Sequence, residues 1–193
     1  MALLIGCEES GVLTTAFRKA GYEAYSCDIL DTRGEARWHY PRDIINLLEL
    51  GGKWDLIILH PDCTALSLSG NRWYGRGMPM NQKRIDAIKW TRKLWQLAKE
   101  HSPRVALENP TSVIFRFLDA PVCYVHPYEH GHGEQKKTGF ALHNLPPLIP
   151  SDLVEGREQR IWKMGPSPTR KRDRSVTYQG IADAIVDQWG PLS

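Results

Sequence analysis

The chain has 193 residues, of which 41% are hydrophobic and 24% are charged, and its formal net charge at pH 7 is +3. A chain of this length and balance buries a core and folds as one domain, residues 1–193, which excludes wholesale disorder. No apolar run approaches the roughly 20 residues of a membrane-spanning helix, and the apolar start at residues 1–6 is too short for a secretory signal, so we expect a cytoplasmic protein without a membrane partner.

Short apolar runs alternate with segments of helical periodicity along the chain. The expected strands, in chain order, are residues 2–6, 22–27, 54–59, 104–107, 122–125 and 138–142. The expected helices are residues 11–20, 44–50, 82–101 and 181–189, and Asp43 is the expected N-cap of the second. Strands that alternate with helices in this way predict an α/β fold of three layers around a mainly parallel sheet.

Polar residues follow four of the expected strands at the points where the strands end. In chain order these endings are Gly6-Cys7-Glu8-Glu9-Ser10-Gly11, Asp28, Pro61-Asp62-Cys63 and Glu108-Asn109-Pro110. Because the carboxyl ends of parallel strands meet at one edge of a sheet, where α/β proteins bind their ligands, we expect these residues to converge. The glycines of the first turn would let a ligand approach backbone N–H groups, and Asp28 is suited to accept hydrogen bonds from ribose hydroxyls.

Basic residues are concentrated in two segments. Residues 72–93 hold seven Lys or Arg and one acid, and residues 157–174 hold seven Lys or Arg and two acids. This distribution favours a polyanionic partner, although either segment alone would fit a solvated helix face or loop. The four cysteines form no CxxC pair, and the histidines of residues 126–132 match no metal-ligand spacing, so we expect free thiols and no metal.

Cys63 and Glu108 are the pair best suited to carry chemistry. A thiolate adds to an electron-poor ring carbon only if the ring is made more electrophilic, which a carboxylic acid can do by donating a proton to a ring nitrogen. The thiolate itself needs a lowered pKa, and the neighbouring carboxylate of Asp62 works against this. A cysteine that packs as a small hydrophobe and a glutamate that caps a helix are the alternative interpretations.

In their order along the chain, these segments resemble the motifs of the DNA (cytosine-5)-methyltransferases, especially the small phage-type members. Leu4 to Gly11 looks like the S-adenosylmethionine-binding glycine turn, and residues 175–189, with Gly180-Ile181-Ala182, look like the last motif, which completes the cofactor pocket. Pro61-Asp62-Cys63 resembles the proline–cysteine motif, and Glu108-Asn109-Pro110 resembles the Glu-Asn-Val motif. The resemblance implies the Rossmann-like fold of S-adenosylmethionine-dependent methyltransferases, in the host cytoplasm if the protein is phage-encoded.

The resemblance also implies a reaction and a set of site residues. Cys63 would attack C6 of a cytosine flipped out of DNA, Glu108 would protonate or hydrogen-bond N3, and C5 would take the methyl group from S-adenosylmethionine. Asn109 joins Cys63 and Glu108 as an implied catalytic residue. The implied cofactor-binding residues are Gly6, Cys7, Glu8, Ser10, Gly11, Asp28, Ile29, Asp43 and Pro61. The residues implied to contact DNA are Ser67, Arg72, Arg76, Lys136, Lys137, Arg170, Lys171 and Arg172, and residues 72–77 would form a loop that closes over the flipped nucleotide.

Three features depart from the family's pattern. Asp62 stands between the proline and the cysteine, lysines replace the arginine of the glutamine–arginine motif at residues 135–137, and a reduced basic loop region, residues 146–174, replaces a target-recognition domain. The short loop region implies relaxed sequence specificity, a partner subunit such as a second copy, or a substrate other than long duplex DNA. The alternatives are therefore the same fold acting on a free cytosine nucleotide or RNA, and a catalytically silent protein that binds DNA or a partner.

Overall fold

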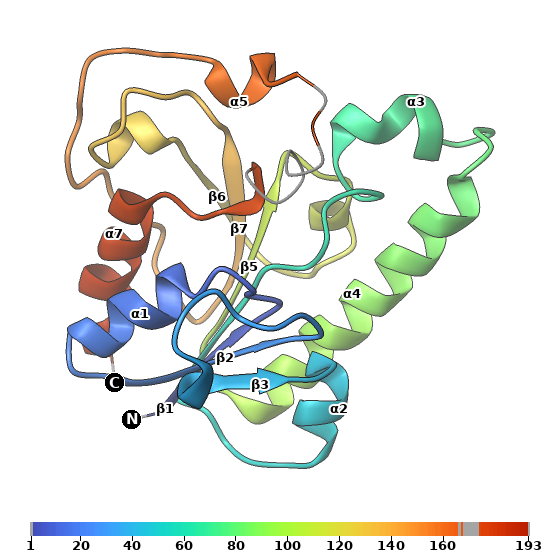
Figure 1. Cartoon of the computed structure of the whole chain (residues 1–193). Helices are drawn as coiled ribbons and strands as arrows, with labels where there is room; N and C mark the ends of the chain where they lie inside the picture. Colours follow the sequence, from blue (N-terminus) through green and yellow to red (C-terminus); the bar gives the residue numbers. More distant parts are fainter. Residues whose placement is uncertain (1, 166, 168–173, 193) are drawn as a thin grey trace.

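The computed structural model describes residues 2–165, 167 and 174–192. Within these residues the chain forms a sheet of seven strands in the order β3-β2-β1-β4-β5-β7-β6 (Figure 1). The first five strands along the chain pair in parallel, and β7 runs antiparallel to both of its neighbours. The strands are β1 Ala2–Gly6, β2 Glu23–Asp28, β3 His39–Pro41, β4 Leu56–Leu59, β5 Val105–Pro110, β6 Val122–Val125 and β7 Thr138–His143.

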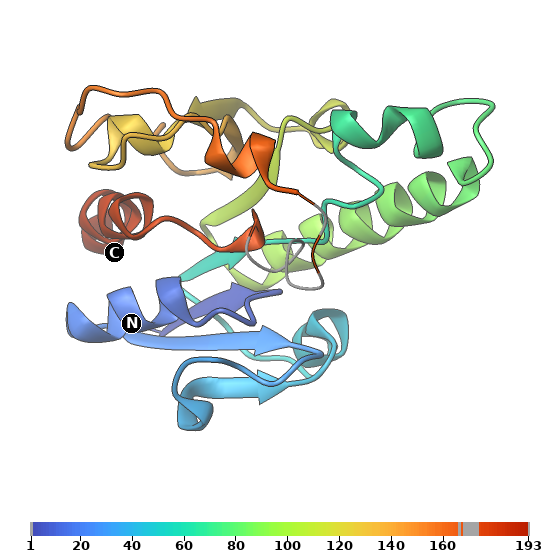
Figure 2. The same cartoon turned by 45° about the horizontal axis from the view of Figure 1, so that its top comes forward.

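Helices cover both faces of the sheet, so the fold is the expected three-layer α/β arrangement of the Rossmann-like type. α1 (Val12–Lys19) and α7 (Gln179–Trp189) pack together on one face, and α2 (Ile44–Glu49) and α4 (Asn81–His101) pack together on the other (Figure 1; Figure 2). None of the helices in the described residues is both long and apolar enough to cross a membrane. The shorter helices are α3 Asn71–Tyr74, α5 Arg160–Lys163, η1 Ala36–Trp38, η2 Leu68–Gly70, η3 Ile114–Arg116, η4 Pro127–Glu129 and η5 Gly190–Leu192.

Alternate residues of the central strands supply two hydrophobic cores, one on each face of the sheet. Leu3 and Ile5 of β1 belong to the core that contains Phe17 of α1, whereas Leu4, between them, belongs to the core that contains Trp95 of α4. All five side chains are fully buried. A strand that is buried on both faces needs a continuous apolar run, which is why β1 reads as apolar at every position.

The carboxyl ends of β1 and β4 lie side by side in the middle of this sheet. The backbone N–H of His60, the residue after β4, donates to the carbonyl of Gly6, the last residue of β1, at 2.9 Å. From β1 the chain adds β2 and β3 on one side of β1, and it then crosses to the other side of β1, where it adds β4 and β5. The direction in which strands are added therefore reverses between β1 and β4. Open α/β sheets bind their ligands outside the carboxyl ends at such a reversal.

The expected helices are confirmed to within two residues, and the strands differ in three respects. β3 was not expected, because a three-residue edge strand that ends in proline carries almost no pattern. The strand expected at residues 54–59 begins only at Leu56. The strand expected at residues 104–107 continues to Pro110, because residues 108–110 pair with β7. Arg72, expected in a loop, lies on helix α3.

Candidate active site

The turn between β1 and α1 has the backbone conformation that its glycines predict. Gly11 has a φ of 68°, and a Cβ built on it would lie 2.9 Å from the Cα of Gly34. The loop after β2 therefore packs directly on the turn, where it is held by hydrogen bonds from Arg33 N and Thr32 Oγ1 to the carbonyl of Glu9. Only glycine at position 11 permits this contact.

The carboxylate of Glu8 caps helix α1 from within the same turn. Its Oε1 accepts a hydrogen bond from Leu13 N at 2.7 Å, and its Oε2 accepts from Thr14 Oγ1 at 2.5 Å and Thr14 N at 3.3 Å. Glu8 is 5% exposed; burial raises the pKa of its carboxyl, and these hydrogen bonds lower it. Because a carboxylate of the protein itself occupies the N-terminus of α1, the turn is ill suited to the pyrophosphate that Rossmann dinucleotide sites hold there.

Replacing Glu8 by alanine should destabilise the fold by about 1–3 kcal/mol, because two N–H groups and a hydroxyl lose their acceptor. Denaturant unfolding followed by circular dichroism measures this loss. Glu9→Ala is the matched control, since the Glu9 side chain forms a partly exposed ion pair with Arg33, at 3.1 Å. Such a pair contributes less than about 1 kcal/mol, so equal losses in the two variants would contradict the capping role of Glu8.

Two of the expected cofactor-binding acids lie close to the glycine turn. Burial raises the pKa of the Cys7 thiol, and the charges of Asp28 and Asp43 raise it further, which places both carboxylates near Cys7. Asp28 accepts the backbone N–H two residues ahead of it at 2.9 Å, and Asp43 caps α2 as expected. Ile29, directly after β2, is 73% exposed, so it offers an apolar surface to a flat ring at this edge of the sheet.

Three other residues expected to bind the cofactor form the frame of the turn. A Cβ built on Gly6 would lie 2.8 Å from a methyl carbon of Leu59. Ser10 Oγ lies 3.4 Å from Glu8 Oε1, and Pro61 is buried. These residues shape the turn, whereas Asp28 and the other acids supply oxygen atoms at its edge.

Cys63 lies in a tight turn directly after β4. Its carbonyl accepts a hydrogen bond from Ser67 N at 2.8 Å, which closes the turn. Asp62, the residue that departs from the family's motif, accepts hydrogen bonds from Thr64 N at 2.9 Å and Thr64 Oγ1 at 2.6 Å. Asp62 therefore stabilises the turn that carries the sulfur atom, although its charge also raises the pKa of the Cys63 thiol, after the larger effects of burial and of Glu108.

The turn that carries Cys63 is joined to the loop that follows β5, the strand that carries Glu108. Two backbone hydrogen bonds of 3.0 Å connect residues 66–68 with residues 111–113. Asn109 is fully buried, and its Nδ2 donates to the carbonyl of Pro61 at 3.0 Å. Asn109 thus holds the backbone of Pro61, two residues before Cys63, and the loops that follow β4 and β5 form one unit.

Lys136, just before β7, adds a cation beside Cys63 and Glu108. Burial lowers the pKa of its ammonium group, and the charges of Glu108 and Cys63 raise it. For the Cys63 thiol, burial has the largest effect and raises the pKa, the charge of Glu108 also raises it, and the charge of Lys136 lowers it. A thiol, a carboxyl and an ammonium group, each from a different part of the chain, therefore act on one another at the carboxyl edge of the sheet.

Arg84 of α4 is a residue of this region that the sequence did not single out. It is 7% exposed, and its guanidinium donates to the carbonyl of Ala65 at 2.6 Å, to Asn71 Oδ1 at 2.7 Å and to the carbonyl of Ser67 at 3.0 Å. Burial lowers its pKa. These three bonds tie the longest helix to the turn of Cys63 and to the start of α3.

The residues expected to contact nucleic acid differ in their exposure. Arg72 and Arg76 are exposed, and Arg72 lies 5.5 Å from the ring centroid of Trp73, which is itself 52% exposed. Lys137 is exposed and lies 4.3 Å from the ring centroid of a tyrosine of β6. Ser67, in contrast, is 8% exposed and its hydroxyl is paired with that of Ser69 at 2.6 Å. Arg170, Lys171 and Arg172 lie outside the described residues.

Glu134 binds residues on both sides of the basic segment 164–173, namely Arg160 before it and Tyr178 after it. It is 4% exposed, accepts a hydrogen bond from the hydroxyl of Tyr178 and forms an ion pair with Arg160 of α5. Lys136 Nζ donates to the carbonyl of Arg174 at 2.9 Å. The flanks of residues 164–173 are therefore held next to Lys136, the cation that acts on Cys63.

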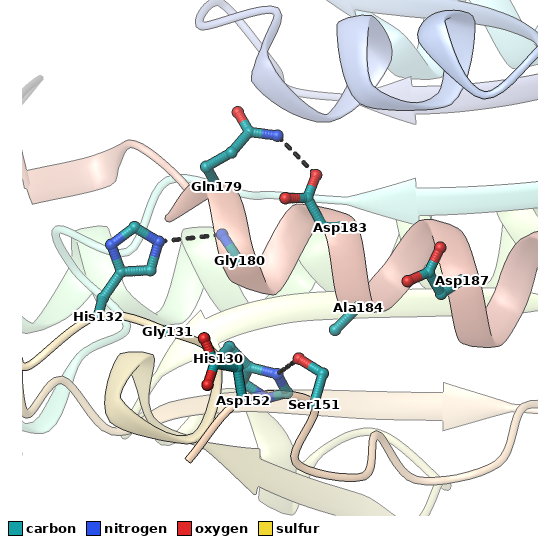
Figure 3. A pocket seen from close by; sticks show the side chains of 10 residues that line it. All are labelled: His130, Gly131, His132, Ser151, Asp152, Gln179, Gly180, Asp183, Ala184 and Asp187. Atoms are coloured by element: carbon teal, nitrogen blue, oxygen red, sulfur yellow. Dashed lines mark hydrogen bonds between the residues drawn. The ribbon is translucent and has the colours of Figure 1, made fainter. Parts of the chain in front are cut away.

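A cavity of about 350 Å³ lies beside α7 and is lined by none of the expected site residues (Figure 3). It includes His132, whose Nε2 accepts the N–H of Gly180 at 3.0 Å, and His130, whose Nδ1 lies 2.9 Å from Ser151 Oγ. A Cβ on Gly180 would lie 1.8 Å from the carbonyl of His130, so the glycine of the last motif serves close packing. In the described part of the chain, no group of three or more His, Cys, Asp or Glu residues could hold a metal ion.

Comparison with solved structures finds chains that match this one at low identity. One is the S. pombe Dnmt2 methyltransferase, which matches at 11% identity over 84% of this chain and 54% of that one, with a TM-score of 0.49. Another is the Entamoeba histolytica methyltransferase EhMeth, which matches at 12% identity over 82% of this chain and 57% of that one, with a TM-score of 0.49. A protein of an E. coli prophage assigned as a DNA modification methyltransferase matches at 12% identity, over 81% of this chain and 53% of that one, with a TM-score of 0.46. The chain thus spans little more than half the length of these proteins. No protein-family model and no curated protein sequence matches it.

Proposed function

We propose that the protein transfers a methyl group from S-adenosylmethionine to C5 of cytosine in DNA through a covalent adduct at Cys63. The observation that carries this proposal is that the charges of Glu108 and Lys136 both act on the pKa of the Cys63 thiol, and that those of Glu108 and Cys63 act on the pKa of the Lys136 ammonium group. A nucleophile, an acid and a cation in one place are what addition to a pyrimidine ring requires.

The glycine turn fits a cofactor that is cationic and free of phosphate. Glu8 already caps α1, so pyrophosphate has no N-terminus to bind, whereas Asp28 and Asp43 place carboxylates near the turn. Asp28 is suited to the ribose hydroxyls, and exposed Ile29 is suited to the face of the adenine. S-adenosylmethionine, when bound, supplies an electrophilic methyl group.

The residues of the chain supply the remaining steps. The Cys63 thiolate adds to C6 of cytosine while Glu108 gives a proton to N3, so that electron density moves to C5, which takes up the methyl group. Loss of the C5 proton to solvent, expulsion of the Cys63 thiolate and return of the N3 proton to Glu108 then restore the aromatic ring and the starting acid. Lys136 favours the thiolate, and Glu108 stops opposing it once it is neutral, which is the form that can donate to N3.

The reaction needs access to a base that duplex DNA keeps stacked. Flipping the base out costs roughly a few kcal/mol, which contacts to the flanking phosphates must offset. Arg72, Arg76 and Trp73 are exposed on the segment after the Cys63 turn, and Lys137 is exposed before β7. Arginines and lysines in such positions suit phosphate oxygens, and an exposed tryptophan suits an unstacked base.

Mechanism-based trapping tests the proposal. A duplex oligonucleotide that carries 5-fluorocytosine should form a covalent adduct with the protein when S-adenosylmethionine is present, because fluorine at C5 cannot leave as a proton does. Denaturing electrophoresis and mass spectrometry detect the adduct and locate it on the peptide of Cys63. Cys63→Ser should abolish the adduct, and Cys123→Ser is the matched control that should retain it; an adduct in Cys63→Ser would show that another residue is the nucleophile.

The same assay separates the alternative substrates. On DNA, raising salt from 50 to 200 mM should weaken binding steeply, because each phosphate contact contributes about −0.9 to the slope of log K against log salt. Activity that resists salt and is highest on a free cytosine nucleotide would favour the nucleotide as substrate, and a preference for RNA oligonucleotides would favour RNA. Cofactor binding without any adduct or any 5-methylcytosine would favour the silent binding protein.

A further inference from the structure

His60 has no role in the reaction outlined above, yet it contacts the acid directly. It follows β4, and its Nδ1 lies 3.3 Å from Oε2 of Glu108. Both side chains are mostly buried, with 11% of His60 and 17% of Glu108 exposed. The backbone N–H of His60 donates to the carbonyl of Gly6 at the glycine turn, and a charge on His60 would lower the pKa of Glu8 in that turn. The histidine therefore lies between the acid of the reaction and the glycine turn.

The surroundings of the ring select one of the two tautomers of the neutral imidazole. Nε2 is buried, and no atom of the described residues forms a hydrogen bond with it. A proton on Nε2 would therefore be a buried donor without an acceptor, which disfavours the Nε2–H tautomer of the neutral ring. The neutral ring with its proton on Nδ1 avoids this, and it can donate that proton to Oε2 of Glu108.

This tautomer has a consequence for the acid. An oxygen that accepts the Nδ1–H of His60 is the poorer position for the proton of Glu108 itself. In the part of the chain that the structure describes, Oε1 of Glu108 accepts no hydrogen bond. The proton of the neutral carboxyl is thus directed to Oε1.

Given the proposed reaction, we propose that His60 is a positioning residue for Glu108: its Nδ1–H holds Oε2, so that the acidic proton sits on Oε1, the oxygen left for N3 of the pyrimidine. His60 neither gains nor loses a proton in the step. It fixes the rotation of the carboxyl group and decides which of the two oxygens can donate, as partners of catalytic side chains do in other sites.

Two substitutions of His60 by side chains of similar length distinguish a hydrogen-bonding role from a packing role. The side-chain amide of His60→Asn can place an N–H where Nδ1–H stands, whereas His60→Leu fills the space without a donor. We expect His60→Asn to form the 5-fluorocytosine adduct within about threefold of the wild-type rate and His60→Leu to be about 10–100-fold slower. The affinity for S-adenosylmethionine should stay the same in both variants. Adduct formation by His60→Asn as slow as that by His60→Leu would overturn the proposal.

A spectroscopic readout decides the matter independently of turnover. In ¹⁵N-labelled wild-type protein at pH 7 to 8, the ring of His60, assigned by its loss in His60→Asn, should show a protonated Nδ1 and an unprotonated Nε2. Glu108→Leu should abolish this signature. A protonated Nε2 in the wild type would overturn the proposal even in an active enzyme. If the wild type forms no adduct but His60 shows the expected tautomer, the proposed reaction is wrong and the link between His60 and Glu108 stands.

Discussion

Replacing Glu108 by glutamine should lower methyl transfer about 10²–10⁴-fold and at the same time make the Cys63 thiol easier to alkylate. Glutamine keeps the size of the side chain but has no acidic proton for N3, so transfer slows. It also removes a negative charge that raises the pKa of Cys63, so this pKa falls and more thiolate is present at a given pH. Alkylation of the Cys63 peptide by iodoacetamide, followed by mass spectrometry between pH 6 and 10, measures the second effect.

Lys136→Met provides the opposite shift in the same experiment. Lys136 lowers the pKa of Cys63, so its removal should move the alkylation profile to higher pH. In the wild type, burial and the two neighbouring carboxylates outweigh Lys136, and the profile should lie above that of an ordinary cysteine. A profile that moves to higher pH in Glu108→Gln would contradict the proximity of the two groups.

Replacing Arg84 by methionine should destabilise the protein by about 3 kcal/mol and slow adduct formation at Cys63 by about 10²-fold. Three acceptors on the Cys63 turn and α3 lose a charged donor, and each buried acceptor left without a partner costs about 1–3 kcal/mol before the structure relaxes. A nucleophile displaced by about 1 Å accounts for the rate. Urea unfolding and the 5-fluorocytosine assay provide the two measurements.

Arg92→Met is the control for Arg84→Met. It lies on the same helix and removes the same charge from an exposed position, so its effect on unfolding should stay within about 0.5 kcal/mol. Equal effects of the two variants on both measurements would mean that the charge of α4, rather than the bonds to the turn, is what matters.

The neighbourhood of Cys63 and Glu108 was accessible from the sequence because it depends on a rule of topology. Glu108 directly follows an apolar run and Cys63 lies four residues beyond the end of another, and parallel strands that alternate with helices bring such endings to one edge of the sheet. The capping of α2 by Asp43 followed in the same way from local chemistry, since a short acidic side chain before an apolar helix satisfies backbone N–H groups without help from distant residues.

The supporting residues were not accessible in this way. Arg84 reads as one more basic residue of a charged segment, and its partners, 13 to 19 residues earlier, are brought to it only by tertiary packing. One local signal did indicate that Arg84 is buried: Arg84 lies four residues before Ile88 and seven before Thr91, and this spacing places it on the buried side of α4. His60 was equally hidden, and Glu8 was expected to bind the cofactor and not to cap α1, because the partners of both residues are set by the way strands and turns meet and not by spacing.

The double attachment at Glu134 has a consequence for how this protein could change. Arg160 on one flank and Tyr178 on the other both reach the same carboxylate, so the distance between the flanks is fixed whatever lies between them. Each doubling in length of a surface loop costs only about 0.6 kcal/mol. A longer segment grafted between residues 163 and 174 should therefore leave Cys63 and Glu108 undisturbed, which would let preference for a target evolve separately from the proposed chemistry.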